Sequence, residues 1–332
     1  MARIAINGLG RIGRAAFKVI MDTDGLDLVA VNDLLPAKNL AYLLKFDTVY
    51  GRYHRSVEAK DNKLVVDGHE IEVFAERDPA QLPWGKHEID LVIESTGLFT
   101  ELDKAKAHLD AGAKQVIISA PTKSPELATV VHGVSHPDAE VKNIFSCASC
   151  TTNSITPVVE IMGRRIGIKK AVLTTIHAYT ASQTLVDGPS KKERSGRAAA
   201  QNMVPSSTGA AIATTKVLPQ FAGKFDGTAV RVPTPVGSLS DITFVTDRPT
   251  SVEEINKIFQ EEAAKPDLKE VLAANTEQIV SSDIIGDSHA SIVDLTLTQV
   301  VDGDLVKVFA WYDNEWGYTN QMIREAKAVL GV

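Results

Sequence analysis

Residues 2 to 13 read ARIAINGLGRIG, and this stretch decides the fold of the first half of the chain. A short apolar run leads straight into Gly8, Gly10 and Gly13, and a helical pattern follows. In units that bind a dinucleotide, the first glycine makes a tight turn, the second admits a pyrophosphate close to the backbone, and the third lets the helix pack on the strand. The pyrophosphate then lies over the helix N-terminus.

An acidic residue closes this unit. The next strand, LDLVAVND at residues 26–33, ends in Asp33, close to the spacing of ~20 residues expected after the first glycine. A carboxylate there accepts hydrogen bonds from both ribose hydroxyls and repels a 2′-phosphate. The pattern favours NAD over NADP as cofactor, and a purely structural glycine turn is the alternative.

Apolar strands alternate with helices up to about residue 149, which predicts an α/β, doubly wound, Rossmann-type sheet. We expect a strand at 89–97 that ends in Thr96 and Gly97 at the carboxyl edge, where a cofactor would lie. His132 falls in a further expected strand, where a core or surface role is the simplest interpretation. The other expected elements are a helix at 36–46, a hairpin of 64–66 with 70–74, a helix at 103–113, and strands at 115–121 and 128–134.

The last third of the chain predicts a different kind of domain. Residues 240–246 alternate as a strand, and 251–265 form an amphipathic helix that opens with a Ser-x-x-Glu capping box. Residues 291–313 read as two strands across Asp302-Gly303, so we expect an α+β domain with an antiparallel sheet. The predicted division is an NAD-binding domain at 1–149, completed by a C-terminal helix at 315–332, and a catalytic domain at 150–314.

The composition excludes several classes of protein. The 332 residues carry a net charge of −7, which argues against a nucleic-acid binder. The chain shows no apolar run of ~18 residues and opens without a leader pattern, so we expect a cytoplasmic protein with no membrane span. Two cysteines cannot build a disulfide framework.

Both cysteines lie in SCASCTTN, at residues 146–153, where a short strand is expected to give way to a helix. Cys147 and Cys150 allow three interpretations: a redox dithiol, half of a metal site, or one nucleophile beside a bystander. No second cysteine pair exists to complete a zinc site, so no metal is expected. A thiol at a helix N-terminus is favoured as thiolate, which is the nucleophilic form.

Other residues offer partners for a thiol nucleophile. The strand expected at 171–180 turns from apolar to polar at His177, and cysteine with histidine is the minimum for covalent catalysis by a thiol. A hydrogen-bonded strand histidine is the alternative. The hydroxyl and N–H groups of Thr208 and Gly209, and an isolated Arg231, suit phosphate oxygens.

The chain resembles the glyceraldehyde-3-phosphate dehydrogenase family from residue 2 to about 330. The motifs that carry the resemblance are AINGLGRIGR, SCTTN at 149–153, HAYT at 177–180, STGAA at 207–211, RVPTP at 231–235 and WYDNEWGY at 311–318. The resemblance implies NAD-dependent oxidative phosphorylation of D-glyceraldehyde 3-phosphate to 1,3-bisphosphoglycerate, through a thiohemiacetal and a thioester on Cys150 with His177 as general base. It also implies a homotetramer. An erythrose-4-phosphate dehydrogenase on the same scaffold is one alternative, and a dithiol redox protein is another.

The resemblance assigns further site residues. Arg11, Ile12, Asp33, Arg77, Ser119 and Asn314 would contact NAD together with the glycines of the first turn, and Asn314 would hold the carboxamide. Ser149, Thr151, Thr180, Thr208, Gly209 and Arg231 would bind the substrate phosphate and inorganic phosphate. Many bacterial members carry Arg-Arg where this chain has Arg194-Ser195, a difference at a further substrate-phosphate contact.

Overall fold

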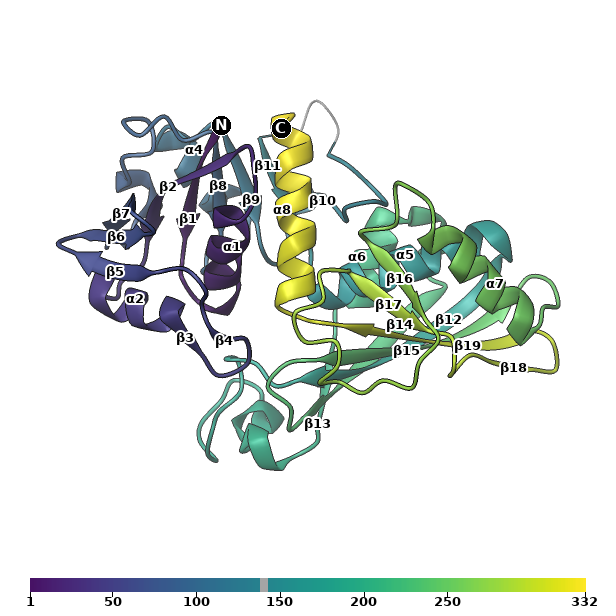
Figure 1. Ribbon diagram of the computed structural model, residues 1–332. Coiled ribbons are helices and arrows are strands. Elements are labelled where there is room, and N and C mark those ends of the chain that lie inside the picture. Colours follow the sequence, from purple (N-terminus) through teal and green to yellow (C-terminus); the bar gives the residue numbers. More distant parts are fainter. Residues whose placement is uncertain (138–142) are drawn as a thin grey trace. The chain divides into compact units, whose positions relative to one another are not determined.

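The computed structural model describes residues 1–137 and 143–332, which form two compact units (Figure 1). The first unit comprises Met1–His132, His136–Ala148 and Met322–Val332, and the second comprises Gly133–Ser135 and Ser149–Gln321. Each unit has a sheet and a hydrophobic core of its own. Among the described residues, no helix is both long enough and apolar enough to cross a membrane.

The first unit is built on a sheet of nine described strands in the order β10-β11-β9-β8-β1-β2-β7-β6-β5. Neighbouring strands run parallel except at the β5-β6 and β6-β7 pairs. The prediction of a doubly wound, mostly parallel sheet is confirmed. Its strands are β1 (Ala2–Asn7), β2 (Leu26–Asn32), β5 (Val57–Lys60), β6 (Lys63–Val66), β7 (His69–Phe74), β8 (Leu91–Glu94), β9 (Gln115–Ile118), β10 (Ala128–Thr129) and β11 (Ile144–Ser146), with a separate pair β3 (Phe46–Asp47) and β4 (Gly51–Arg52).

Strand β1 marks the point where the strand order reverses, because β2 lies on one side of it and β8 on the other. Ligands of open α/β sheets bind at such a point, outside the carboxyl ends of the strands. The turn after β1 is tied to both neighbours: Gly8 N–H donates to the Asn32 carbonyl at 2.8 Å, and Ser95 N–H donates to the Asn7 carbonyl at 2.8 Å. The nucleotide-binding turn is thereby held at that point.

Two local predictions for the first unit are wrong. The helix expected at 103–113 is broken into α3 (Leu102–Ala105) and α4 (Ala107–Asp110). The strand expected at 128–134 is only the two-residue β10, and His132 lies in a turn. Gly133 has a φ of +77°, a left-handed conformation that a strand does not contain, so no strand can run through residues 128–134. The remaining helices of this unit are α1 (Arg11–Met21), η1 (Pro79–Gln81) and α2 (Ala37–Lys45).

The second unit contains a sheet of eight described strands in the order β13-β14-β12-β15-β19-β17-β16, and β18 also pairs with β19. Most pairs are antiparallel, as expected, while β12-β14 and β16-β17 are parallel. Three strands, rather than the two expected, occupy 291–313. The strands are β12 (Ile168–Ala178), β13 (Val204–Ser207), β14 (Phe225–Val232), β15 (Ser238–Thr246), β16 (Leu272–Asn275), β17 (Ser291–Asp294), β18 (Gln299–Val301) and β19 (Leu305–Tyr312).

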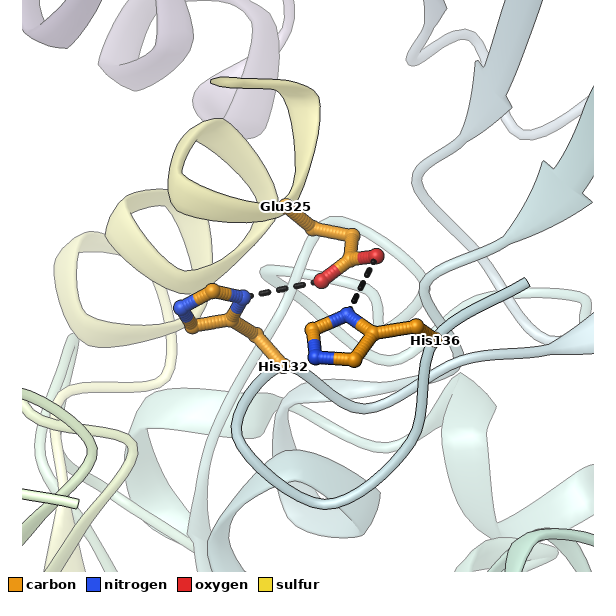
Figure 2. Close-up of side chains that lie close together, drawn as sticks. All are labelled: His132, His136 and Glu325. Carbon is orange, nitrogen blue, oxygen red and sulfur yellow. Dashed lines mark hydrogen bonds and ion pairs between the residues drawn. The ribbon is translucent and has the colours of Figure 1, made fainter. Parts of the chain in front are cut away.

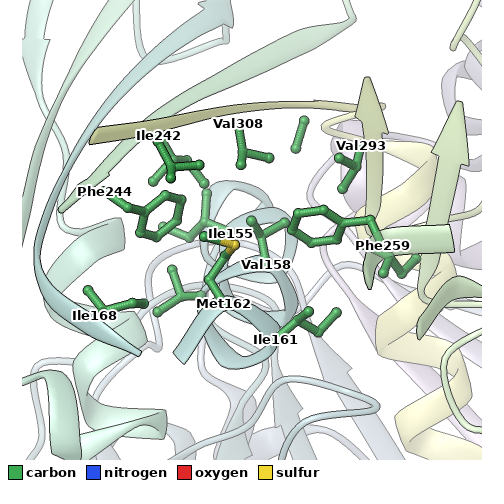
Figure 3. Close-up of a cluster of buried hydrophobic side chains, with 14 of the residues drawn as sticks. Ile155, Val158, Ile161, Met162, Ile168, Ile242, Phe244, Phe259, Val293 and Val308 are labelled. Carbon is green, nitrogen blue, oxygen red and sulfur yellow. The ribbon is translucent and has the colours of Figure 1, made fainter. Parts of the chain in front are cut away.

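Helix α5 (Cys150–Arg165) lies in the core of the second unit, and its apolar face packs against the sheet (Figure 3). Ile155, Val158 and Met162 on the helix and Ile242 and Phe244 on β15 are all fully buried. This packing fixes the N-terminus of α5, and with it Cys150. The other helices are η2 (Glu193–Gly196), η3 (Ala199–Gln201), α6 (Ala210–Val217), η4 (Pro219–Phe221), α7 (Val252–Ala263) and α8 (Trp316–Leu330), which contributes residues to both units.

Candidate active site

A cavity of about 350 Å³ opens in the first unit beside the glycine turn. Five of the predicted cofactor residues line it: Gly8, Gly10, Asp33, Arg77 and Thr96. The space above Gly10 is open, since a Cβ there would meet no atom within 4 Å. A Cβ on Gly13 would lie only 1.9 Å from the Gly8 carbonyl oxygen. The two glycines therefore do what a dinucleotide requires, one leaving room for a pyrophosphate and one for the helix.

The carboxylate of Asp33 is positioned by the same turn. Its Oδ2 accepts from the Leu9 N–H at 2.8 Å, and its Oδ1 accepts from the Leu35 N–H at 3.0 Å. Each oxygen keeps a lone pair for a ribose hydroxyl. The residues of this cavity fit a dinucleotide with free ribose hydroxyls.

The remaining cofactor candidates of the first unit lie around this cavity without lining it. Arg11 and Ile12 begin α1, and the Arg11 guanidinium is paired with Asp47 at 2.5 Å. Gly97 follows Thr96 with a φ of +74°. Ser119 follows β9, and its N–H donates to the Glu94 carbonyl at 2.9 Å. The Arg11 side chain therefore already has an ion-pair partner within the protein.

Asn314 belongs to the second unit, where its orientation is fixed. The buried amide oxygen accepts from the Gly237 N–H and from the Ser238 hydroxyl, each at 3.1 Å. Its Nδ2 makes no hydrogen bond to any described residue. Two donors are therefore presented in a fixed direction, as recognition of a carboxamide oxygen requires.

Cys150 is the first residue of α5, and Ser149 caps that helix. The Ser149 hydroxyl accepts from the Thr152 N–H at 3.1 Å, and its backbone carbonyl accepts from the Asn153 side chain at 2.9 Å. A serine cap satisfies one of the unpaired N–H groups of the first turn. The predicted change from strand to helix at SCASCTTN is confirmed, and it places the thiol where helix N–H groups converge.

Cys150, His177 and Arg231 form a chain of contacts in the second unit. The Cys150 Sγ lies 3.4 Å from the His177 Nε2, and the other ring nitrogen, Nδ1, lies 2.6 Å from the Arg231 Nη1 and 2.7 Å from the Ala178 carbonyl oxygen. His177 on β12 and Arg231 on β14 are direct partners in the parallel register of these strands. The pairing of β12 with β14 therefore places the His177 imidazole in contact with both the Cys150 thiol and the Arg231 guanidinium.

Burial is the largest cause of the pKa shifts of His177 and Cys150. Burial, and after it the neighbouring Arg231 charge, lower the pKa of His177 to about 3. Burial also raises the pKa of the Cys150 thiol, although Arg231 and the Thr151 N–H act in the opposite direction. The expectation that the helix N-terminus favours the thiolate is therefore overturned, because desolvation outweighs it. The ground state is a neutral thiol beside a neutral imidazole.

This state makes the reactivity of Cys150 dependent on pH. A thiol with a raised pKa is a minor thiolate at neutral pH, and below the pKa the thiolate fraction grows about tenfold per pH unit. We expect the alkylation rate of Cys150 by iodoacetamide to rise without levelling between pH 7 and pH 9, measured by mass spectrometry. A plateau near neutral pH would instead reveal a preformed thiolate–imidazolium pair.

Two residues that the sequence patterns did not single out, Tyr312 and Thr175, form a hydrogen-bond network beside Cys150. The Tyr312 hydroxyl lies 2.9 Å from the Thr151 hydroxyl and 2.8 Å from the Thr175 hydroxyl. The Tyr312 ring meets the His177 ring edge-on at 5.9 Å. Thr151 is buried, and its hydroxyl contacts both Tyr312 and the Cys150 thiol, where it favours the thiolate. WYDNEWGY contained Tyr312, but nothing in its spacing pointed to this role.

The phosphate candidates are spread over several elements of the second unit. Thr180 follows β12 and lies 2.9 Å from the Ser182 hydroxyl. Thr208 accepts from the Ala210 N–H at 3.1 Å, and Gly209 is the N-cap of α6. Arg194, with Lys191 and Lys192, lines a different cavity of about 710 Å³ that includes neither Cys150 nor His177. The structure therefore does not bring Arg194 to the catalytic pair.

Cys147 has a different environment from Cys150. It lies in the first unit with 3 % of its surface exposed, and its N–H donates to the Ile118 carbonyl at 3.0 Å. Burial raises the pKa of its thiol far above the ordinary value, and the Glu325 charge adds to this. Neither cysteine forms a disulfide in the described part of the chain. Cys147 thus lacks the solvent access that a nucleophile or a redox partner needs.

Two family models match the chain. The glyceraldehyde 3-phosphate dehydrogenase NAD binding domain matches residues 2–102, and the C-terminal domain of the same family matches residues 149–314. The second match begins one residue before Cys150 and contains His177 and Arg231.

Related proteins match over nearly the whole length. A glyceraldehyde-3-phosphate dehydrogenase 1 of Trichormus variabilis is 48% identical over 97% of this chain and 94% of its own length. The protein of that name from Bacillus cereus is 47% identical over 97% of both chains. A glyceraldehyde-3-phosphate dehydrogenase of Clostridium pasteurianum is 46% identical over 98% of this chain and 97% of its own. The chain belongs to the glyceraldehyde-3-phosphate dehydrogenase family.

Proposed function

We propose that this chain catalyses the NAD-dependent oxidative phosphorylation of D-glyceraldehyde 3-phosphate to 1,3-bisphosphoglycerate. The observation that carries this proposal is the contact of the Cys150 Sγ with the His177 Nε2 at 3.4 Å. The full-length similarity to dehydrogenases of this name and the NAD-binding domain match support it. The enzyme is an oxidoreductase that uses NAD.

The first step forms a bond between Cys150 and the aldehyde carbon. As the thiol loses its proton to His177, the sulfur attacks the carbonyl carbon, and the imidazolium returns that proton to the carbonyl oxygen, which becomes the hydroxyl of a thiohemiacetal. For this role the Nε2 must carry a lone pair, which places the ring proton on Nδ1, 2.7 Å from the Ala178 carbonyl oxygen; the Arg231 Nη1, a donor 2.6 Å from the same nitrogen, must then turn towards a bound anion. His177 then removes the hydroxyl proton as the carbon is oxidised to a thioester. NAD, when bound, accepts the hydride that leaves the carbon.

The second step breaks the thioester. An oxygen of inorganic phosphate attacks the acyl carbon, the carbon–sulfur bond breaks, and the electron pair returns to the Cys150 sulfur. Sulfur suits this sequence because a thioester keeps the energy of oxidation that an ester would lose. Fixed donors near the thiol, including the N–H groups at the start of α5, stabilise the developing oxyanion.

Arg231 couples anion binding to the base. Its guanidinium disfavours a proton on His177, so an anion that neutralises Arg231 raises the pKa of His177 and makes it a stronger base when substrate is present. Arg231 is therefore proposed both to bind a phosphate group and to make His177 a stronger base when that group is bound. Thr180, Thr208 and Gly209 are proposed as further donors to phosphate, together with Ser149 and the Thr151 backbone.

Replacing Arg231 by glutamine tests this coupling. A charge-assisted hydrogen bond contributes about 1.5–3 kcal/mol, so we expect the KM for phosphate or for the aldehyde to rise about 10- to 100-fold. Arg248→Gln is the matched control, because this exposed arginine pairs with Glu254 at 2.7 Å. Steady-state kinetics with each substrate varied in turn would measure the change. Equal KM values in the parent protein and Arg231→Gln would refute the role.

The overall proposal is tested by one steady-state assay. We expect NADH to form from D-glyceraldehyde 3-phosphate only when phosphate or arsenate is present, and more efficiently than from erythrose 4-phosphate. Comparison of NAD with NADP in the same assay examines the role of Asp33. A higher kcat/KM with erythrose 4-phosphate, or turnover independent of phosphate, would contradict the proposed reaction.

The assembly and location are proposed on separate grounds. We propose a homotetramer, because the segment around η2 leaves large apolar side chains exposed: Leu185 at 79%, Val186 at 72% and Met203 at 76%. Such apolar surface is typical of a face that another subunit covers. The cytoplasm is proposed because free thiols such as Cys150 persist in a reducing compartment. The functional division is proposed to be residues 1–149 with 315–332 for NAD, and 150–314 for catalysis.

A further inference from the structure

Two histidines of the first unit converge on one buried carboxylate, and none of these three residues is assigned to the dehydrogenase reaction (Figure 2). The Nδ1 of His132 lies 2.8 Å from one oxygen of Glu325, and the Nδ1 of His136 lies 3.2 Å from the other. The two rings are 6.1 Å apart at 77° to each other, so both nitrogens point at the same small volume.

The elements that carry these side chains are fixed independently. Glu325 projects from α8, while His132 and His136 flank the turn after β10 that contains Gly133. A Cβ on Gly133 would lie 2.7 Å from the Val271 side chain, so only glycine allows the turn to bring the two histidines together. The turn therefore determines the spacing of the two imidazoles.

Among the described residues, no lysine or arginine pairs with the Glu325 carboxylate. The Glu325 side chain is 1% exposed, and its only ion pairs among the described residues are those with His132 and His136. Buried carboxylates are usually paired with a lysine or an arginine, or they bind a metal ion. A cation held by all three side chains would balance the carboxylate while both imidazoles stayed neutral.

The solvent exposure of the three side chains increases from Glu325 through His132 to His136. The side chain of His132 is 20% exposed and that of His136 is 62% exposed, so the cluster opens to solvent on the side of His136. An ion can enter there, and water can complete its coordination. A metal site with three protein ligands and one water has this arrangement.

We propose that His132, His136 and Glu325 bind one zinc ion or a similar transition-metal ion. The three ligand atoms lie within 4.8 Å of one another, and neighbouring ligands of a tetrahedral zinc site are about 3.3 Å apart. Two imidazole nitrogens and one carboxylate oxygen suit zinc, cobalt or iron, whereas magnesium and calcium prefer oxygen ligands alone. On binding, the metal takes the Nδ1 lone pairs, and each ring proton moves to Nε2.

Such an ion would link α8 to the turn after β10, because its ligands come from both. Because the ion binds the folded chain in preference to the unfolded one, it raises the unfolding temperature, and the stabilisation grows with the logarithm of its concentration. The proposal does not depend on the reaction catalysed at Cys150, and metal binding is measured without any turnover. Failure of one proposal leaves the other intact.

The test is a zinc titration of the full chain against a chromophoric chelator, in a Cys150→Ser background that removes the reactive thiol. We expect one zinc ion per chain and at least about tenfold weaker binding in His136→Ala, an exposed position where folding is not at risk. Glu325→Gln, which keeps the shape of the side chain, should lose binding as well. Magnesium at the same concentration should not compete.

His289→Ala is the matched control, because His289 also contacts a carboxylate, Asp287, at 2.7 Å but belongs to no group of three possible metal ligands among the described residues. It should bind zinc as the background protein does. Cobalt(II) then reports the ligand set through its visible absorption. No zinc binding in the background, unchanged binding in both His136→Ala and Glu325→Gln, or a thiolate-to-cobalt band from Cys147 would overturn the proposal.

Discussion

Cys150→Ser will lower the rate of NADH formation by at least about 10⁴-fold, the largest effect expected of any single substitution in this chain. Serine keeps the size of the side chain and the contact with His177, but its hydroxyl is a far weaker nucleophile and cannot form a thioester. The loss should fall on kcat, with NAD binding unchanged because the cavity beside Gly10 lies in the other unit.

Cys147→Ala is the matched control for this substitution. Cys147 is 3% exposed and its thiol is too buried to reach a substrate, so its removal should leave kcat within a few-fold of the parent value. Steady-state kinetics of both variants, with circular dichroism to verify folding, would separate them. Activity that survives in Cys150→Ser and disappears in Cys147→Ala would mean that the nucleophile is misassigned.

His177→Asn should lower kcat by about 10²- to 10⁴-fold, the range typical of losing a general base. Asparagine can still donate to the Ala178 carbonyl but offers no basic nitrogen to the thiol or to the thiohemiacetal. Because the pKa of His177 is about 3 in the free protein, the imidazole is already neutral throughout the neutral range. Loss of the base form therefore begins only as the pH falls towards that value.

The pH profile distinguishes the base from a purely structural role. In the parent protein, kcat/KM should increase with pH towards the raised pKa of Cys150, and that limb should persist in His177→Asn at a much lower level. His289→Asn, a histidine of the same unit outside the site, should retain the parent rate. A loss of less than threefold in His177→Asn would leave the proton acceptor unidentified.

Local sequence patterns predicted local structure well. The turn of Gly8, Gly10 and Gly13 lies between β1 and α1 as expected, and Asp67-Gly68 forms the hairpin of β6 and β7 with both φ angles positive. Ser251 caps α7 by accepting from the Glu254 N–H at 3.3 Å. Each of these features depends on residues close in sequence, which is why the pattern was sufficient.

The predictions that failed depend on features that a pattern does not contain. The strand expected through His132 ends early because Gly133 adopts a left-handed conformation. The thiol of Cys150 was expected to be acidic from its place at a helix N-terminus, but the extent of burial decides its pKa and is known only from the packed structure.

The most informative contact was also beyond sequence reasoning. Arg231 lies against His177 because β12 and β14 pair in parallel with these two residues in register. Register between strands far apart in the chain follows from the packing of whole elements rather than from either segment alone. The proposed roles of Cys150 and His177 could be inferred from motifs, whereas the contact of Arg231 with His177, on which the proposed coupling to an anion rests, required the fold.

A single-turnover experiment tests the central claim most directly. The enzyme is mixed with NAD and D-glyceraldehyde 3-phosphate without phosphate, quenched in acid, digested and analysed by mass spectrometry. We expect one NADH per active site and a 3-phosphoglyceryl thioester on Cys150, which added phosphate then removes as turnover resumes. NADH formed without any acyl group on Cys150, or an acyl group that phosphate does not release, would contradict the account.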